Sequence, residues 1–429
     1  MHNPISRRGF LIGLVTALGA AAVSCGRQIL GQAEARPAAT FGVDLPLVTK
    51  GAPGNLATST PTLTETPPAA TWTPTSGTSP KVIHVHSSSA TNWNYSTGWY
   101  GSYVSQSTVN SMVDEGVKRL TGQSTVAAAW QTLLPGYSPG KGIAIKVNFN
   151  NAQCTDTDNL IDALIHPVNA LIAGMKQIGV REQDVWIYDA SRPIPSRFRS
   201  GCPYTGVQYF DKGCAHLSTW TSTDPNASVI FANPSLTPRR VSDVIINASY
   251  LINMPIMKDH DIAGVTLGFK NHFGTIDQIV IGGWGSSNDP HEYIRPGGAR
   301  YSSSYSPFVD IYKNSHIRNK TALVVGDGLY GAYGSGSNTA TPPKMWQSFK
   351  TRYPSSNGAP NSLFFSKDPV AIDCVMMDIL YAEPTYHPYQ GSGSDDYLKV
   401  ARDAGLGVFE HGSPWGAGYT KINYQRVEL

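Results

Sequence analysis

Charged residues are scarce in this sequence of 429 residues. Asp, Glu, Lys and Arg together make up 15% of it, and 33 basic residues nearly balance 30 acidic ones, so that the net charge is +3. Proteins that bind nucleic acids usually carry a clustered excess of Lys and Arg, and we therefore expect no nucleic-acid partner. In contrast, 21 Tyr, 13 Phe and 9 Trp provide enough apolar surface for a core, which excludes global disorder.

Several common catalytic motifs are missing as well. The sequence contains no G-x-x-x-x-G-K-[ST] loop and no H-E-x-x-H motif, which excludes the usual NTPases and zinc proteases. Cysteine is sparse, and the five cysteines include no C-x-x-C pair. Iron–sulfur clusters are held by closely spaced thiolates, so we expect no such cluster here.

The first 25 residues are similar to an export signal. Residues 6–11 (SRRGFL) contain paired arginines followed by a large apolar residue, as in twin-arginine signals, and the apolar run of residues 11–23 is too short to span a bilayer. We therefore predict a signal peptide over residues 1–24, with the twin-arginine export machinery as a partner. Residues 22–25 (AVSC) resemble a lipobox, in which Cys25 is lipidated; ordinary signal-peptidase cleavage nearby is the alternative.

Residues 25–80 are expected to form a disordered tether. Within them, residues 52–80 are dominated by Thr, Pro and Ser and contain one charged residue, Glu65, so they bury too little surface to fold and remain extended. Loss of Arg7 and Arg8 with the signal lowers the net charge from +3 to +1, so that membrane attachment would depend on the lipid anchor alone. The expected location is the outer face of the cytoplasmic membrane or the cell surface.

Residues 81–429 predict a single large α/β domain. Short apolar strands alternate with amphipathic helices along this part of the chain, which indicates a mainly parallel sheet with helices on both faces. The predicted strands cover residues 81–86, 142–149, 184–190, 228–232, 322–328 and 362–366, and a long apolar stretch covers 244–257. The predicted helices cover residues 109–120, 161–178, 308–317, 370–382 and 397–404.

Polar residues end several of these strands. In parallel α/β sheets, ligands bind beyond the carboxyl ends of the strands. Lys146 and Asn148 end one strand, and Asp189, Asp327 and Asp368 follow three others. The aspartates are candidate ligands of a divalent metal ion, because hard cations prefer oxygen ligands. Asp368, which precedes a proline, also fits the N-cap of a helix.

The densest group of polar residues lies between residues 253 and 274. Lys258 and His260 end the apolar stretch, and Lys270 follows between two glycines. A lysine can hold a phosphate, carboxylate or sulfate, and a histidine can transfer a proton near neutral pH. We therefore predict Lys258, His260 and Lys270 as catalytic residues, and an anionic small molecule as the ligand.

The order of these motifs resembles that of a known family, domain-of-unknown-function family 362. The family pattern Lys-x-His, then Thr, then Lys-Asn-x-x-Gly is similar to residues 258–274, which implies Thr266 and Asn271 as further ligand-binding residues beside Lys146 and Asn148. The remaining matches are Lys-x-Asn at 146–148, Asp-Gly at 327–328, Ser-x-Asp-Pro-Val-Ala-x-Asp at 366–373 and the segment ARDAGLG at 401–407. Many family members carry clustered cysteines for iron–sulfur clusters and are assigned a redox role, which the cysteine spacing here does not support.

Two further groups could hold a metal ion or be structural. Cys202 and Cys214 bracket a loop rich in Gly, Pro and Tyr, and an exported protein can retain disulfides. We predict a Cys202–Cys214 disulfide, and a metal site formed by these cysteines with His216 is the alternative. His84 and His86 lie on one face of a predicted strand, where they are either metal ligands or two structural histidines.

A glycine-rich loop follows the polar group. Residues 282–285 (GGWG) precede the stretch 288–304, which contains His291, Glu292, Arg295 and Arg300. This region is expected to be either a lid over the site or a plain surface loop.

Two classes of function remain open at this point. The first is an enzyme that binds an anionic substrate or cofactor, with or without a divalent metal, and uses Lys and His for acid–base chemistry. The second is a non-catalytic protein that binds a ligand or metal, or a redox accessory protein without its own cluster. Twin-arginine export carries folded proteins that often hold a cofactor, which favours the enzyme.

Overall fold

Apolar strands from the whole predicted domain join in one large sheet. The computed structural model describes residues 78–150, 152–277, 279–334, 341–384 and 393–429, which belong to one unit extending from Thr66 to Leu429. The predicted signal peptide, Cys25 and most of the predicted tether lie outside the described residues. Among the described residues, no helix is both long and apolar enough to cross a membrane.

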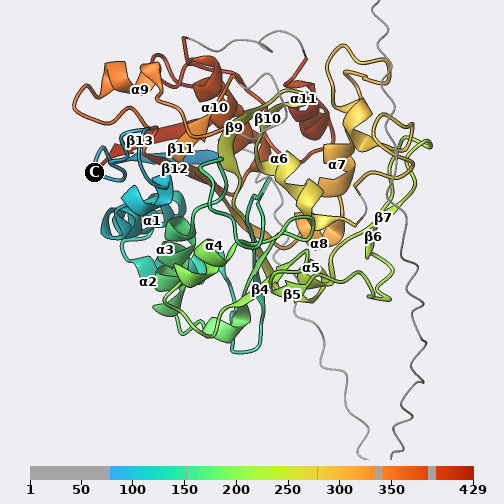
Figure 1. Ribbon diagram of the computed structural model, residues 1–429, viewed down its shortest axis with the longest axis horizontal. Helices are drawn as coiled ribbons and strands as arrows, with labels where there is room; N and C mark the ends of the chain where they lie inside the picture. The colour runs from blue at the N-terminus through green and yellow to red at the C-terminus, as the bar shows by residue number, and fades with distance from the viewer. Residues whose placement is uncertain (1–77, 151, 278, 335–340, 385–392) are drawn as a thin grey trace, which may run out of the picture. The chain divides into compact units, whose positions relative to one another are not determined.

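The strands form a mixed sheet that is mostly parallel (Figure 1). They are β1 (Lys81–His86), β2 (Ile143–Lys146), β3 (Val185–Tyr188), β4 (Gln208–Asp211), β5 (His216–Leu217), β6 (Ser228–Val229), β7 (Arg239–Arg240), β8 (Tyr250–Asn253), β9 (Ile256–His260), β10 (Gly264–Thr266), β11 (Thr321–Ala332), β12 (Ser362–Ser366) and β13 (Asn423–Glu428). The main path runs in the order β13-β1-β12-β11-β8-β2-β3-β4-β5, with β9 beside β11 and β10 beside β9, while β6 and β7 form a separate pair. In the main sheet, β12 runs antiparallel to both β1 and β11, and β10 antiparallel to β9, whereas the remaining paired strands are parallel.

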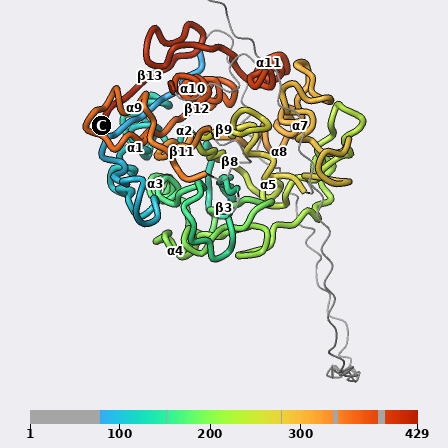
Figure 2. The backbone as a smooth tube through the Cα atoms, turned by 45° about the horizontal axis from the view of Figure 1, so that its top comes forward, coloured from blue at the N-terminus to red at the C-terminus, as the bar shows by residue number. Residues whose placement is uncertain are grey.

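Helices cover both faces of this sheet, as predicted. The α-helices are α1 (Gln106–Thr121), α2 (Val126–Leu133), α3 (Ile165–Lys176), α4 (Ser196–Ser200), α5 (Asp243–Asn247), α6 (Gly268–Asn271), α7 (Pro307–Tyr312), α8 (Ser315–Arg318), α9 (Gln347–Arg352), α10 (Pro369–Tyr381) and α11 (Asp396–Asp403). Successive residues of a strand point to opposite faces. Phe365 of β12 therefore packs in one apolar core with Val109 of α1, and the neighbouring Phe364 packs in the other core with Met376 of α10. Figures 1 and 2 show α1 beside α3, and α10 close to α11.

Local signals explain where these helices begin and end. Ser105 caps the N-terminus of α1, and Gly122 ends that helix in the left-handed conformation, with a φ of 72°, which glycine adopts without steric cost. At the start of α10, Oδ1 of Asp368 accepts the N–H groups of Val370 and Ala371, each at 2.9 Å. The N-cap role that the sequence allowed for Asp368 is therefore confirmed.

Two predicted segments are divided in the structure. The apolar stretch 244–257 contains most of α5, then β8, and then the start of β9. Pro255 separates the two strands, since it has no N–H group to donate to a neighbouring strand. The predicted helix 308–317 is divided into α7 and α8, because the side chain of Asn314 accepts the N–H of His316 and starts a second helix. Apolar residues continue across the first break, whereas the second falls at residues 313–316 (KNSH), which are all polar.

Candidate functional site

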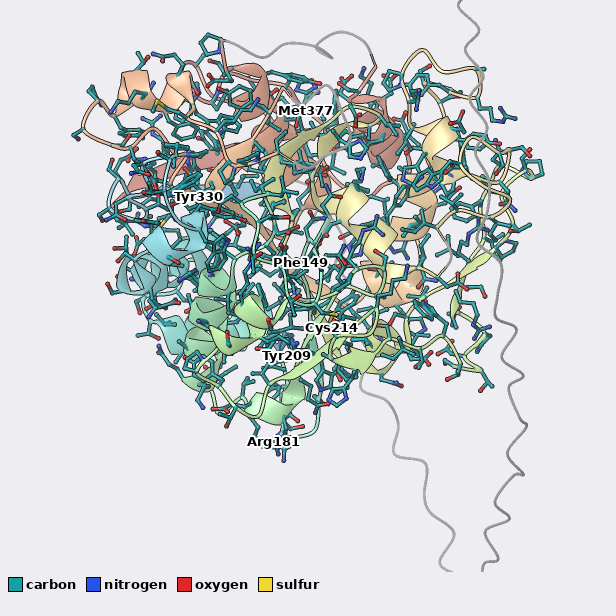
Figure 3. All side chains as sticks on the ribbon, in the orientation of Figure 1. Phe149, Arg181, Tyr209, Cys214, Tyr330 and Met377 are labelled. Carbon is teal, nitrogen blue, oxygen red and sulfur yellow. A yellow bond between two sulfur atoms is a disulfide. The ribbon has the colours of Figure 1, made fainter. Side chains whose placement is uncertain are left out.

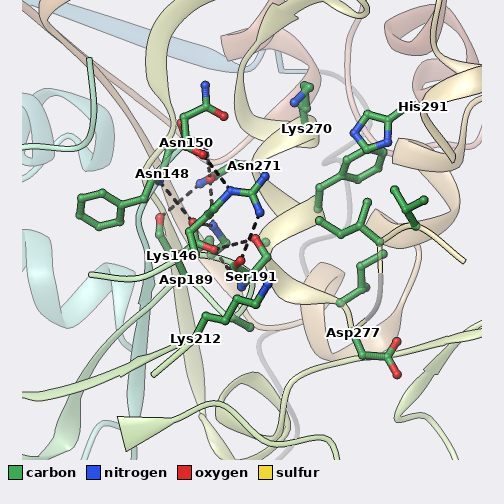
Figure 4. A pocket seen from close by; sticks show the side chains of 18 of the residues that line it. Lys146, Asn148, Asn150, Asp189, Ser191, Lys212, Lys270, Asn271, Asp277 and His291 are labelled. Carbon is green, nitrogen blue, oxygen red and sulfur yellow. Dashed lines mark hydrogen bonds and ion pairs between the residues drawn. The ribbon is translucent and has the colours of Figure 1, made fainter. Parts of the chain in front are cut away.

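A cavity of about 700 Å³ lies beyond the carboxyl ends of β2 and β3. Parallel α/β sheets bind ligands at this edge. Lys146 ends β2, Asp189 follows β3, Lys212 follows β4, and Lys270 comes from α6. Figure 4 shows these side chains around the cavity, with Asp277 well separated from Lys270 in this view. The cavity is therefore built by segments that are far apart in the sequence.

A second cavity, of about 610 Å³, adjoins the first. Lining residues common to both cavities are Asn150, Arg192, Lys270, Trp284 and His291. The second cavity is also lined by His260, Asp289, Glu292 and Arg295, among others. Because the two cavities share the wall that carries Lys270, a ligand in either one is within reach of this lysine.

Lys146 is fully buried, and its three N–H donors all have partners. Its Nζ donates to the carbonyl oxygen of Val147 at 2.6 Å, to Oδ2 of Asp189 at 3.1 Å and to Oδ1 of Asn271 at 3.1 Å. A buried ammonium group needs such partners, because an unpaired charge is costly in the interior. Gly274 packs against this ion pair, since a Cβ atom there would lie 2.6 Å from Nζ of Lys146. Lys146 thus supports the cavity wall and holds Asp189 and Asn271 in position.

The predicted ligand-binding residues Asn148 and Asn271 meet in the same wall. Nδ2 of Asn148 donates to Oδ1 of Asn271 at 3.1 Å, and Nδ2 of Asn271 donates to Oδ1 of Asn253 at 2.7 Å. Within the described residues, Oδ1 of Asn148 is buried without a hydrogen-bond partner, although the residue lines the first cavity. Buried polar atoms without partners are uncommon, so this oxygen is available to accept a hydrogen bond from a ligand.

Asp373 of α10 positions the short helix that carries Lys270. Its two carboxylate oxygens accept the N–H groups of Gly268 at 2.8 Å and Phe269 at 3.2 Å. The hydroxyl of Tyr397 also donates to this carboxylate, at 3.2 Å. Burial raises the pKa of Asp373 to about 7. The segment 366–373 and the segment 268–271 are therefore joined by side-chain to main-chain hydrogen bonds.

Lys258 lies close enough to Lys270 for its charge to act on Lys270. Burial, followed by the positive charges of Lys258 and Arg192, lowers the pKa of Lys270 to about 7. Burial also lowers the pKa of Lys258 to about 8, and the carboxylate of Asp259 opposes this effect. In the part of the chain that the structure describes, Nζ of Lys258 is buried without a hydrogen-bond partner. Both lysines are therefore able to change protonation state near neutral pH.

His260 is held in one tautomer by the main chain. Its Nδ1 accepts the N–H groups of Ile262 at 3.1 Å and Ala263 at 3.2 Å, so the proton of the neutral ring is on Nε2. Burial, followed by the charges of Lys270 and Lys258, lowers the pKa of His260 well below its usual value. The three residues that we predicted as catalytic thus lie near one another, with His260 on the wall of the second cavity.

One predicted ligand residue lies away from the two cavities, and two residues that line the first cavity were not predicted. The predicted ligand residue Thr266 is buried in β10, where its hydroxyl donates to the carbonyl oxygen of Asp259 at 3.4 Å, and it is not among the residues that line these two cavities. Arg192 and Lys212 line the first cavity but were not predicted. Arg192 donates from Nε to the carbonyl oxygen of Asn150 at 2.8 Å. Both cations follow the carboxyl end of a parallel strand, which is the signal that could have identified them.

The three aspartates that we predicted as metal ligands do not share a site. Because β12 is antiparallel to β11, Ser366 lies opposite Val324, and Asp368 is at the other edge of the sheet from Asp189. Asp327 of β11 is separated from β3 by β8 and β2, which is roughly 14 Å at the usual strand spacing. The predicted three-residue metal site is therefore wrong. In the described residues, no three His, Cys, Asp or Glu side chains are grouped so as to hold one metal ion.

The predicted Cys202–Cys214 disulfide is also wrong. Cys214, labelled in Figure 3, pairs with Cys154, and the Cα atoms of these residues are 5.4 Å apart. Cys202 is a free thiol. The alternative metal site with His216 fails for the same reason, since a sulfur in a disulfide is not a thiolate ligand. Cys154 follows β2 and Cys214 follows β4, so the sheet brings together two cysteines that are 60 residues apart.

His84 and His86 are structural residues rather than a metal pair. Nδ1 of His84 lies 2.7 Å from the hydroxyl of Tyr424, and its Nε2 lies 2.8 Å from Oγ of Ser362. Nδ1 of His86 lies 2.7 Å from Oε2 of Glu428. Burial lowers the pKa of both histidines. These contacts join β1 to its two neighbours, β12 and β13.

The glycine-rich loop lies against both cavities. Trp284 and His291 line both of them, and Glu292 and Arg295 line the second. Of the two alternatives for this loop, its position favours a part of the site over a plain surface loop.

The pentapeptide at residues 136–140 (GYSPG) has the letters of the nucleophile motif G-x-S-x-G. That motif acts in a turn from a strand to a helix. Here it lies between α2 and β2, and Ser138 is exposed. It therefore has no part in the site.

Residues 143–378, which are more than half of the chain, match the family described as Domain of unknown function (DUF362). The matched span contains β2, α6 and most of α10, and therefore Lys146, Lys270 and Asp373. No curated protein matches the chain. Because the match covers more than half of the chain, the chain belongs to the DUF362 family.

Proposed function

We propose that the protein binds an anionic small molecule in the first cavity, held by Lys270, Arg192 and Lys212. One observation carries this proposal. The three cations line one cavity, and none of them has a carboxylate partner among the described residues. By contrast, the buried Lys146 in the same wall is neutralised by Asp189 at 3.1 Å.

The electrostatics of the cavity favour an anion. The whole chain is nearly neutral, with a net charge of +3, so the positive charge of this wall is local. Lys270 and Arg192 are partly buried, whereas Lys212 is exposed. Cations that repel one another are stabilised when a negative group enters between them. The lowered pKa of Lys270 has this repulsion as one of its causes. Phosphates, sulfates and carboxylates are the groups that Lys and Arg bind through charge-assisted hydrogen bonds.

Acid–base chemistry on the bound molecule is the second part of the proposal. A general acid or base works best when its pKa is near the ambient pH, and the pKa of Lys270 is about 7. His260 offers an N–H group from its Nε2 at the wall of the adjoining cavity. Lys270 would move a proton to or from a ligand that His260 orients by this hydrogen bond. Binding without catalysis is the alternative.

We further propose that the protein acts outside the cytoplasm, attached by a lipid on Cys25. The signal-like residues 6–11 and the lipobox-like residues 22–25 support this location. The Cys154–Cys214 disulfide supports it independently, because disulfides form and persist mainly in oxidising compartments.

Isothermal titration calorimetry with sulfate at pH 6 tests the anion site. We expect sulfate to bind the wild-type protein, and Lys270→Met to weaken its affinity roughly tenfold or more, as loss of a charge-assisted hydrogen bond does. Lys141→Met is the matched control. Lys141 lies just before β2, at the opposite edge of the sheet, where its Nζ donates to the carbonyl oxygen of Gly136 at 2.6 Å.

The control variant should bind sulfate with the wild-type affinity. Absence of sulfate binding by the wild-type protein would overturn the proposal. Equal sulfate affinities of Lys270→Met and the wild-type protein would overturn it as well.

A further inference from the structure

Two large apolar side chains at the first cavity are unusually exposed. The exposed fraction of Trp284 is 72% and that of Leu217 is 62%, and both residues line this cavity. An isolated exposed apolar residue needs no explanation, whereas apolar residues gathered at a concave surface mark a binding site. The exposure of these two residues therefore indicates that an apolar part of the ligand covers them.

Apolar residues also make up much of the wall of this cavity as a whole. Its apolar lining residues include Leu217, Trp220, Phe273, Ile276, Ile279, Val280 and Trp284. Ligand pockets commonly combine such a wall with a few polar groups that orient the ligand. The cations described above are the polar groups of this cavity.

A row of rings connects the exposed indole to the cationic group. The ring centroid of Trp284 is 4.9 Å from that of His291, which is 5.1 Å from that of Phe273. Nζ of Lys270 lies 5.7 Å from the centroid of Phe273. This row of rings, which includes His291, thus joins the exposed indole to the positive charge of Lys270 along one side of the cavity.

Asp289 holds in place the two members of this row that lie in the glycine-rich loop, Trp284 and His291. Its Oδ2 accepts the N–H of Gly285 at 3.0 Å, and its Oδ1 accepts the N–H of His291 at 2.9 Å. Gly283 and Gly285 flank Trp284 with φ values of 90° and 80°, which other residues rarely adopt. The loop therefore has a defined shape that holds the indole at the cavity, exposed to solvent.

We infer that the ligand is an anion attached to a flat apolar or aromatic body, with the anionic group at Lys270 and the body stacked on Trp284. This inference rests on the proposed anion site and narrows its ligand class to aromatic sulfonates, phosphates or carboxylates and molecules of similar shape. Stacking on an exposed indole removes apolar surface of both partners from water. A bare inorganic anion leaves that surface uncovered.

Calorimetry with benzenesulfonate and methanesulfonate at pH 6 tests the inference. Both are monoanions, so they differ only in the body that carries the sulfonate. We expect benzenesulfonate to bind the wild-type protein at least about tenfold more tightly than methanesulfonate, which corresponds to about 1.4 kcal/mol. Trp284→Ala should weaken benzenesulfonate binding much more than methanesulfonate binding and so abolish this preference, and Trp284→Phe should retain most of it, since phenylalanine also stacks.

Ile230→Ala is the matched control, since Ile230 is 68% exposed but is not among the residues that line either cavity. This variant should keep the preference. The inference is overturned when the two sulfonates bind wild type equally, or when Trp284→Ala weakens both by the same factor. In those cases, sulfate binding that depends on Lys270 would still support the proposed function. If the wild-type protein bound neither the sulfonates nor sulfate, both the inference and the proposed function would be overturned.

Discussion

At the scale of single residues, the burial of Lys270 makes anion binding at the site depend on pH. Burial is the largest cause of its low pKa of about 7, and the positive charges of Lys258, Arg192 and Lys146 add to it, while the carboxylate of Asp261 opposes it. The ammonium group therefore loses its proton as the pH rises through neutrality. A bound anion stabilises the charged form, so anion affinity is full below pH 7 and declines above it.

We predict that the affinity for sulfate falls as the pH rises from 6 to 9. The slope should approach roughly tenfold per pH unit above the pKa of Lys270, because each pKa unit corresponds to a factor of ten in the charged fraction. Lys270→Arg should keep binding sulfate and lose most of this pH dependence, since the guanidinium group stays charged throughout. Calorimetry across this pH range measures both proteins. An unchanged slope in Lys270→Arg would assign the titration to another group.

The residues of the site were predictable to different degrees. Lys270 and Asn271 stand in a dense polar motif with glycines, which is visible in the sequence. Arg192 and Lys212 stand alone after their strands, where a solvated surface cation looks the same. Their role depends on neighbours from other segments, and sequence patterns do not report those neighbours. The function of Lys146 as a support was hidden for the same reason, because its partners Asp189 and Asn271 are distant in the chain.

At the scale of elements, α6 depends on a carboxylate from another helix. It has four residues, and no side chain at its own N-cap accepts a hydrogen bond there. So short a helix is unstable by itself. The carboxylate of Asp373 supplies the missing cap from α10, and its side chain is fully buried. The position of Lys270 is therefore set by a contact between two segments of the chain.

We predict that Asp373→Asn lowers both stability and sulfate affinity. Asparagine has the same shape, but it can accept with only one atom, and its NH₂ group would face a main-chain N–H. Loss of a helix cap costs about 1 kcal/mol, and displacement of α6 should weaken sulfate binding severalfold. Thermal unfolding and calorimetry measure the two effects.

Ser105→Ala provides the comparison for this variant. It removes the cap of α1, on the opposite face of the sheet, and should lower the melting temperature without changing sulfate affinity. A wild-type sulfate affinity in Asp373→Asn would contradict the positioning role of Asp373.

Several strands and the longest helices were predicted close to their observed positions, whereas the reversed direction of β12 was not predicted. β1 and β12 have the predicted bounds, because short apolar runs between turns are a strong signal for strands. Nothing in such a run indicates whether it will pair parallel or antiparallel. β12 is antiparallel to β11 and is separated from β3 by three strands, and both facts keep Asp368 away from Asp189.

At the scale of the whole molecule, the Cys154–Cys214 disulfide joins two loops beside the first cavity. One loop follows β2 and begins near Asn150, and the other follows β4 and carries Lys212. Both of these residues line the cavity. The disulfide therefore restrains one side of the site as well as the domain.

We predict that Cys154→Ser combined with Cys214→Ser lowers stability and weakens sulfate binding. The bridged residues are 60 apart, and closing a loop of that length lowers the entropy of the unfolded chain by an amount worth up to about 4 kcal/mol. Chemical denaturation measures the loss, and calorimetry should show a severalfold weaker sulfate affinity. Cys202→Ser serves as the control, because Cys202 is a free thiol. Equal losses of stability in this control would contradict the pairing.

The sequence by itself determined the α/β class, several of the strands, the longest helices, the family and the motif around Lys270. These properties are carried by local patterns, since apolar periodicity and short polar motifs involve residues that are near one another in the chain. Only the tertiary structure decided the direction of β12, the pairing of Cys154 with Cys214 and the meeting of Lys270 with Arg192, Lys212 and Trp284. Each of these depends on which distant segments become neighbours when the strands assemble, and that choice is made by the packing of the whole domain.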